Sequence, residues 1–99
     1  MIIHPAELKE RLSHHEALNL IDVREPVEFS TFNIGGTNIP LQALHQHIDA
    51  LKHLANQEII VLCQRGLRSQ TAQKLLIKAG FTSVKNLEGG LLAYNRINS

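Results

Sequence analysis

The chain contains a single cysteine, and the residues around it indicate a nucleophile. Cys63 ends an apolar run over 59–62, and the next six residues are Gln64, Arg65, Gly66, Leu67, Arg68 and Ser69. A strand, a short loop and a helix start, in this order, direct backbone N–H groups and the positive end of a helix dipole toward one sulfur atom. Such surroundings favour the thiolate over the thiol, so the sequence predicts a reactive sulfur.

The alternative interpretation of Cys63 is a core residue, because free cysteine is among the most buried residue types. The charged neighbours favour the reactive interpretation. Arg65 and Arg68 follow closely, Gly66 permits a tight loop, and no carboxylate occurs between Cys63 and Ala79. A cationic loop without acidic residues suits a sulfur anion and an anionic substrate.

Short apolar segments alternate with amphipathic ones, which predicts an α/β fold with buried parallel strands. We expect strands over 18–23, 37–39, 58–62 and 84–87. We expect helices from residue 5, over 27–31, over 41–55, from the cysteine loop to Gly80, and over 91–97. Ser69 is the expected N-cap of the helix after the loop. Cys63 then lies where open α/β sheets usually place their ligand sites.

Length and composition limit the classes of protein. The 99 residues fit one domain over 1–99, and the net charge of +1 implies no general attraction to nucleic acid or to a membrane. One cysteine excludes an internal disulfide and a multi-cysteine zinc site, so the expected compartment is the cytoplasm. Without a signal sequence or a long apolar run, we expect a soluble, unprocessed protein.

Six histidines could indicate a metal site, but their spacing argues against it. Positions 14 and 15, and 45 and 47, are one or two apart and diverge on a helix. We expect surface residues, no metal and no cofactor. None lies near Cys63 in sequence, so no cysteine–histidine dyad is proposed.

Four segments in order resemble the signature motifs of the rhodanese family. They are residues 20–29, 33–40, 63–69 and 86–94, that is LIDVREPVEF, NIGGTNIP, CQRGLRS and NLEGGLLAY. The resemblance implies a three-layer fold, in which a small, mostly parallel sheet of four or five strands carries helices on both faces. It also implies a single-domain sulfurtransferase.

The implied reaction is covalent sulfur transfer. Cys63 would take the outer sulfur of a small anionic donor, thiosulfate or another persulfide, and pass it from a cysteine persulfide to a thiol or cyanide. The loop amides from Gln64 to Ser69, Gly66 and Leu67 included, could hold the persulfide anion. Arg68 would supply charge and Arg65 would capture the substrate. The alternative for both arginines is a solvated surface charge.

Three further residues would support the loop. Asp22 and Arg24 flank Val23 at a strand end, and the resemblance implies that they brace the loop rather than react. The alternative is an exposed ion pair that contributes little stability. Glu88 could bond loop amides or Arg68.

The chain departs from the family pattern at several positions. Many thiosulfate-using members have a basic residue directly after the cysteine, where this chain has Gln64. Asn33 replaces the usual histidine of the second motif, which is one residue shorter than its commonest form, and Tyr94 replaces the tryptophan of the last motif. The sequence therefore leaves the physiological donor and acceptor open, as it does the oligomeric state.

Two other functions stay open. A small phosphatase or arsenate reductase also uses a thiolate in an anion-binding loop, but its spacing has five residues between cysteine and arginine, whereas Cys63 and Arg68 enclose four. A non-enzymatic sulfur carrier or interaction module would look the same in sequence, because fold does not fix function. Its partner could be a sulfur-relay protein.

Overall fold

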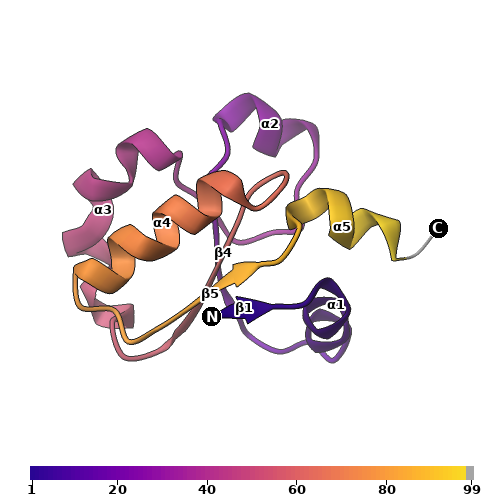
Figure 1. Cartoon of the computed structure of the whole chain (residues 1–99), viewed down its shortest axis with the longest axis horizontal. Helices are drawn as coiled ribbons and strands as arrows, with labels where there is room; N and C mark the ends of the chain where they lie inside the picture. Colours follow the sequence, from indigo (N-terminus) through magenta and orange to yellow (C-terminus); the bar gives the residue numbers. More distant parts are fainter. Residues whose placement is uncertain (98–99) are drawn as a thin grey trace.

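Five short parallel strands form the central sheet of the computed structural model, which describes residues 1–97 (Figure 1). The order across the sheet is β1-β5-β4-β2-β3, from β1 (Ile2–Ile3), β5 (Ser83–Leu87), β4 (Glu58–Leu62), β2 (Asn19–Asp22) and β3 (Thr37–Asn38). The helices are α1 (Pro5–Ser13), α2 (Pro26–Thr31), α3 (Leu44–Leu51), α4 (Leu67–Lys78) and α5 (Gly90–Arg96). Every strand pair is parallel, so the prediction of an α/β fold with a small, mostly parallel sheet is confirmed.

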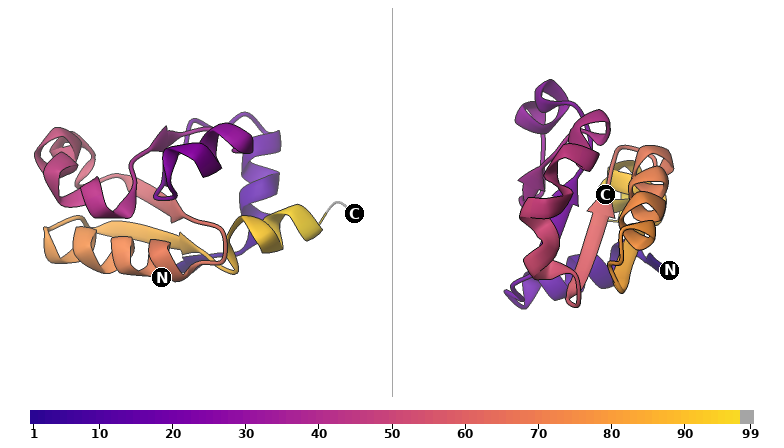
Figure 2. Two further views of the ribbon diagram at one scale, coloured as in Figure 1. Left: turned by 90° about the horizontal axis from the view of Figure 1, so that it is seen from above. Right: turned by 90° about the vertical axis from the view of Figure 1, so that its left-hand side faces the viewer.

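Side chains of the central strand β4 alternate between two apolar layers, because successive residues of a strand face opposite sides of the sheet. Ile59, Val61 and Cys63 belong to one buried cluster, together with residues of α3 and α4. Ile60 and Leu62 belong to the other, together with residues of α1 and α5. Figures 1 and 2 show α3 and α4 side by side and α1 next to α5. The predicted three-layer arrangement is therefore present.

Several boundaries differ from the prediction. β1 was not expected, because two residues are too few to show a periodic pattern; it forms by pairing with β5, Ile2 opposite Asn86. The expected helix over 41–55 is divided into a 3-10 turn η1 (Leu41–Ala43), α3 and a second 3-10 turn η2 (Lys52–Leu54). The other elements lie within a residue or two of the expected ranges.

The prediction that Ser69 caps α4 is wrong. The helix begins at Leu67, and its N-cap is Gly66, whose φ of 96° is in the left-handed region that glycine tolerates. Ser69 is therefore inside the first turn. Its side chain is buried and faces Cys63 instead of the helix end.

The chain diverges at the carboxyl ends of β2 and β4. After β2 it continues outward to β3, and after β4 it continues in the opposite direction to β5. Open α/β sheets bind ligands in the crevice that such a divergence creates. Cys63 and α2 both lie at this end of the sheet, next to the crevice.

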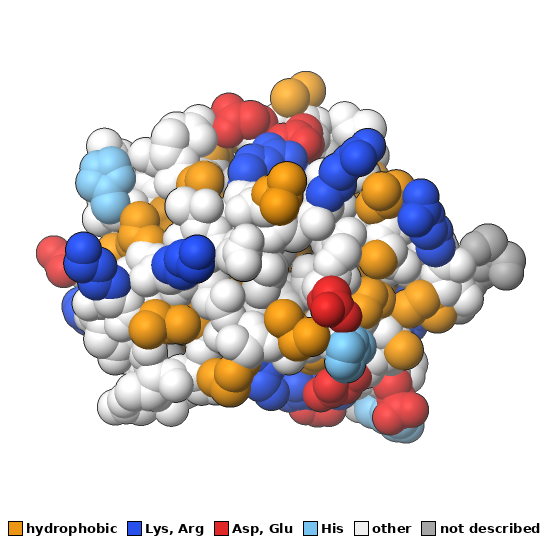
Figure 3. Space-filling model, in the orientation of Figure 1, with side chains coloured by type: hydrophobic (Ala, Val, Ile, Leu, Met, Phe, Trp, Pro, Cys, Tyr) orange, Lys and Arg blue, Asp and Glu red, His pale blue; other side chains and the backbone are white. Residues whose placement is uncertain are grey.

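On the face shown in Figure 3, basic and acidic side chains are both scattered over the surface, and neither sign covers a large area. This distribution agrees with the small net charge of +1. No helix within residues 1–97 is long and apolar enough to cross a membrane.

Candidate active site

The loop after β4 surrounds the sulfur of Cys63 with hydrogen-bond donors. The backbone N–H groups of Gly66 and Ser69 donate to Sγ over 3.1 and 3.4 Å. The hydroxyl of Ser69 lies 3.3 Å from the same atom. Because α4 begins at Leu67, its unpaired N-terminal amides and dipole add positive potential at this point.

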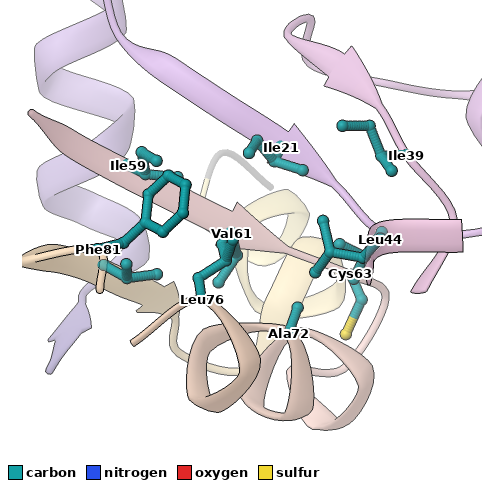
Figure 4. Packing of buried hydrophobic residues seen from close by; sticks show 11 residues of the cluster. Ile21, Ile39, Leu44, Ile59, Val61, Cys63, Ala72, Leu76 and Phe81 are labelled. Atoms are coloured by element: carbon teal, nitrogen blue, oxygen red, sulfur yellow. The ribbon is translucent and has the colours of Figure 1, made fainter. Parts of the chain in front are cut away.

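Cys63 is both a core residue and a member of this loop. Its side chain is only 2% exposed and packs in the apolar cluster with Ala72, as Figure 4 shows. It also lines a pocket of about 280 Å³, whose other residues are Gln64, Arg65, Leu67 and Arg68. The two interpretations of Cys63 from the sequence are therefore compatible, since the thiol is buried at the base of a pocket.

Burial and hydrogen bonding act in opposite directions on the pKa of Cys63. Burial alone raises it, because the thiolate loses solvation. The hydrogen bonds from the Ser69 hydroxyl and from the amides of Ser69, Gly66 and Arg65 lower it, and together they outweigh burial. The pKa of Cys63 consequently lies below that of an ordinary thiol.

The first turn of α5 holds the cysteine loop from the other side. The amides of Leu91 and Leu92 donate to the carbonyls of Cys63 and Gln64 over 2.9 and 3.0 Å. Gly90 makes this approach possible: a Cβ atom there would lie 2.5 Å from the Gln64 carbonyl carbon and 2.6 Å from the Arg65 nitrogen. The glycine pair of the fourth motif thus allows the backbone of this segment to contact the backbone of the loop.

Asn86 was not among the predicted site residues, but its side chain forms hydrogen bonds with two of them, Gly66 and Ser69. Its Nδ2 donates to the Gly66 carbonyl over 3.1 Å, and its Oδ1 accepts from the Ser69 hydroxyl over 2.5 Å. The sequence signal was an asparagine at a strand position that shares its face with Val84 and alternates with Lys85. A buried amide that needs partners marks such a position.

The two arginines of the loop have different environments. Arg68 donates to both carboxylate oxygens of Glu28 on α2, over 2.6 and 2.9 Å. This pairing raises the pKa of Arg68 and neutralises part of its charge. Arg65 is exposed at the pocket and forms no ion pair with another of residues 1–97. Arg65 is thus the cation more available to an incoming anion.

The Glu28–Arg68 pair predicts an acid-dependent contribution to stability. Hydrogen bonds from Arg68 lower the pKa of Glu28 from 4.5 to about 2. Since the folded-state value is the lower one, the stabilisation is complete above pH 4.5 and disappears as the pH falls toward about 2. Glu28→Gln should therefore be less stable than the parent at neutral pH and equally stable near pH 2. The difference should stay below about 1 kcal/mol, because both side chains are partly solvated.

Urea unfolding at a series of pH values measures this difference. Glu10→Gln on α1 is the matched control, since no side-chain ion pair within residues 1–97 is recorded for Glu10. A stability difference for Glu28→Gln that does not change with pH would contradict the assignment.

Asp22 and Arg24 form a buried ion pair, so the alternative of an exposed pair is wrong. The side chain of Asp22 is fully buried and that of Arg24 is 4% exposed, with 2.8 Å between Nη2 and Oδ2. Arg24 also donates to the carbonyls of Glu28, within α2, and of Phe32, just after its last residue. The pair therefore fixes α2, which in turn carries Glu28, the partner of Arg68.

The expectation that Glu88 bonds the loop or Arg68 is not met. Its carboxylate lies 2.8 Å from Nδ1 of His4, and its side chain is 54% exposed. The physical reason is the pairing of β1 with β5, which places the residues after these strands side by side: the amide of Glu88 donates to the carbonyl of Ile3. The adjacent glycines approach the loop instead.

A second hollow adjoins the pocket at Cys63. It has a volume of about 380 Å³ and lies over α2 and α5, lined by Arg24, Val27, Glu28, Thr31, Phe32, Gln64 and Asn95. Gln64 lines both hollows. The uncharged residue after the cysteine therefore separates the two.

Fold and site together define a protein in which a buried thiol is held by the amides between a strand and a helix. Comparison with known families agrees, since residues 4–97 match the Rhodanese-like domain. The chain belongs to the rhodanese-like family. The resemblance to this family in the sequence motifs is thus confirmed.

Curated relatives include proteins of similar length and much longer ones. The chain is 34% identical over 93 residues to the putative sulfurtransferase YtwF of Bacillus subtilis, covering 93% of this chain and 87% of YtwF. It is 37% identical over 93 residues to the probable adenylyltransferase/sulfurtransferase MoeZ of Mycobacterium tuberculosis. That match covers 93% of this chain but only 24% of MoeZ, so the chain spans about a quarter of that relative.

Solved structures share the fold over nearly the whole chain. A rhodanese-related protein from Thermoplasma volcanium has a TM-score of 0.82 at 28% identity, covering 98% of this chain and 92% of its own. The human single-domain sulfurtransferase TSTD1 has a TM-score of 0.83 at 25% identity, with coverage of 99% and 97%.

Proposed function

We propose that the protein is a sulfurtransferase that moves sulfane sulfur through a persulfide on Cys63. The observation that carries the proposal is the arrangement around one buried sulfur: two amides donate to Sγ, and a hydroxyl lies 3.3 Å from it. Relatives named as sulfurtransferases support the same general chemistry. We take the cytoplasm as the compartment, residues 1–99 as one domain, and no cofactor as necessary.

The reaction balances in two steps. The Cys63 thiolate attacks the outer sulfur of thiosulfate or of another persulfide, so that an S–S bond forms and the donor leaves as sulfite or as a thiolate. The outer sulfur then carries the negative charge in the pocket. A thiol or cyanide attacks that sulfur, and Cys63 is released as the thiolate.

The loop residues take different parts in this scheme. The amides of Arg65, Gly66 and Ser69 stabilise Sγ. The amides of Leu67 and Arg68, at the N-terminus of α4, would donate to the outer sulfur of the persulfide. Arg65 would attract the anionic donor, and Gln64 would contact whatever extends toward α2. Asp22 and Arg24 would act only by holding α2.

A carrier function is the second candidate, and its supporting observation is the printed name of a relative. The putative sulfur carrier protein YrkF of Bacillus subtilis is 34% identical over 84 residues, which is 84% of this chain and 44% of YrkF. A carrier would accept sulfur from one protein and deliver it to another in a sulfur relay. Multiple turnovers with small molecules would distinguish the enzyme from the carrier.

Intact-mass measurement tests the proposal. The protein is incubated with thiosulfate, with polysulfide, or with a cysteine desulfurase and cysteine, and the expected result is a gain of one sulfur atom per chain. Subsequent cyanide should remove it as thiocyanate. No adduct from any of the three donors would contradict the proposal, and so would turnover of an aryl phosphate alone, which would indicate a phosphatase.

A further inference from the structure

The hydroxyl of Ser69 lies between two hydrogen-bond acceptors but has one hydrogen to donate. Its Oγ is 2.5 Å from Oδ1 of Asn86 and 3.3 Å from Sγ of Cys63. The short contact places the hydrogen on the Asn86 side. With the hydrogen on that side, Sγ donates to Oγ, because two lone pairs facing one another would repel, and this is the arrangement of the neutral thiol.

The orientation of Asn86 is fixed independently of Ser69. Its Nδ2 donates to the carbonyl of Gly66, which leaves only Oδ1 to face the hydroxyl. The residue is 8% exposed and lies within β5, paired with β4. No buried side-chain nitrogen or oxygen within residues 1–97 lacks a partner, so the connection from Cys63 to Asn86 is fully satisfied.

We propose that Asn86 is a positioning residue that holds the Ser69 hydroxyl hydrogen while Sγ is neutral and yields it to Sγ when the thiolate forms. The inference rests on the proposed function in taking Cys63 as the reacting thiol. When Cys63 loses its proton to solvent, the hydroxyl turns from Oδ1 to the sulfur anion. When the persulfide S–S bond forms, Sγ is neutral again, the charge lies on the outer sulfur, and the hydroxyl returns to Asn86.

This arrangement sets how basic the thiolate is. Turning the hydroxyl toward Sγ costs the hydrogen bond to Asn86, so Asn86 makes the thiolate less stable than Ser69 alone would. A thiolate that is less stabilised is the better nucleophile, because the intrinsic nucleophilicity of a thiolate decreases as the pKa of its thiol decreases. Asn86 would therefore preserve reactivity in a loop whose other donors reduce it.

Two substitutions separate this role from loop support. Asn86→Leu and Asn86→Asp both lose the donor to the Gly66 carbonyl, but only the aspartate keeps an acceptor for Ser69. Each is made in the parent and in a Ser69→Ala background. The rate of iodoacetamide alkylation is measured against pH for all six proteins. The other charged groups near Cys63, namely Arg65 and Arg68 on the loop and α4, Glu28 on α2, and the Asp22–Arg24 pair at the end of β2, are unchanged throughout.

In the parent background, Asn86→Leu should lower the alkylation midpoint by about half a pH unit, which is about threefold more thiolate below the midpoint. Asn86→Asp should raise it. With Ser69→Ala, the effect of the leucine should vanish and that of the aspartate should shrink to its charge effect. A purely structural role predicts instead that both substitutions raise the midpoint, because the loop donors would move away.

An unchanged or raised midpoint in Asn86→Leu, or equal shifts in the two backgrounds, would overturn the proposal. If Asn86→Leu does not fold, Asn86→Asp in the parent and in the Ser69→Ala background decides the question. Equal increases in the alkylation midpoint in these two backgrounds would also overturn the proposal. Alkylation needs no sulfur donor. Failure of sulfur transfer in the parent would therefore refute the proposed function while leaving this measurement intact.

Discussion

Cys63→Ser should abolish sulfur loading. A serine hydroxyl is not ionised by the donors that stabilise the thiolate, and its oxygen does not form a persulfide. Removal of a covalent nucleophile typically costs at least about three orders of magnitude in turnover. Intact mass after thiosulfate should show no added sulfur, and thiocyanate production should fall to the level without protein.

The chain contains no other cysteine, so an adduct in the parent is assigned to Cys63 without mapping. The substitution is nearly isosteric, and the hydroxyl can use the amides of Gly66 and Ser69 as partners. Urea unfolding serves as the control for folding. Parent-level loading or turnover in a folded Cys63→Ser protein would place the chemistry elsewhere.

Gly90→Ala should disrupt the cysteine loop from outside it. The new Cβ would lie 2.5 Å from the carbonyl carbon and oxygen of Gln64, and Gly90 has a φ of 65°. The contacted atoms are backbone, so a rotamer change cannot relieve the overlap. We expect a loss of about 2–5 kcal/mol in the free energy of unfolding, from overpacking and backbone strain together. Sulfur loading should slow by a factor on the order of ten or more as the loop amides move.

Gly80→Ala is the matched control for this prediction. Gly80 also has a positive φ, 101°, but a Cβ there would meet no atom within 4 Å. It should lose only the strain contribution, about 1–2 kcal/mol, with no change in loading rate once folded. Equal effects of the two substitutions on loading would show that the turn does not hold the loop.

The sequence was sufficient to predict the elements that have a strong local pattern. Residues 59–62 are a continuous apolar run of strand length, and the observed β4 has the same first and last residues as the expected strand. The cysteine loop was located for the same reason, since its arginines, glycine and following helix are contiguous. Contacts within a few residues of one another are encoded locally.

The parts that escaped prediction depend on contacts between distant segments. β1 exists because it pairs with β5, more than eighty residues later in the chain. Asn86 reaches Ser69 across a strand and a helix start, and Arg68 meets Glu28 from another helix. The pattern within each segment carries no information on such partners. The misplaced roles of Ser69 and Glu88 have the same cause.

The pairing of β1 with β5 makes the extreme N-terminal residues close neighbours of the active loop. The carbonyl of Met1 accepts hydrogen bonds from the amide of Asn86 and from Nε2 of Gln73. Only two residues form this edge strand, so it should open readily in local unfolding. Each such opening would loosen Asn86 and, through Ser69, the sulfur. Opening of β1 and thiol reactivity should therefore rise and fall together, although the two segments are far apart along the chain.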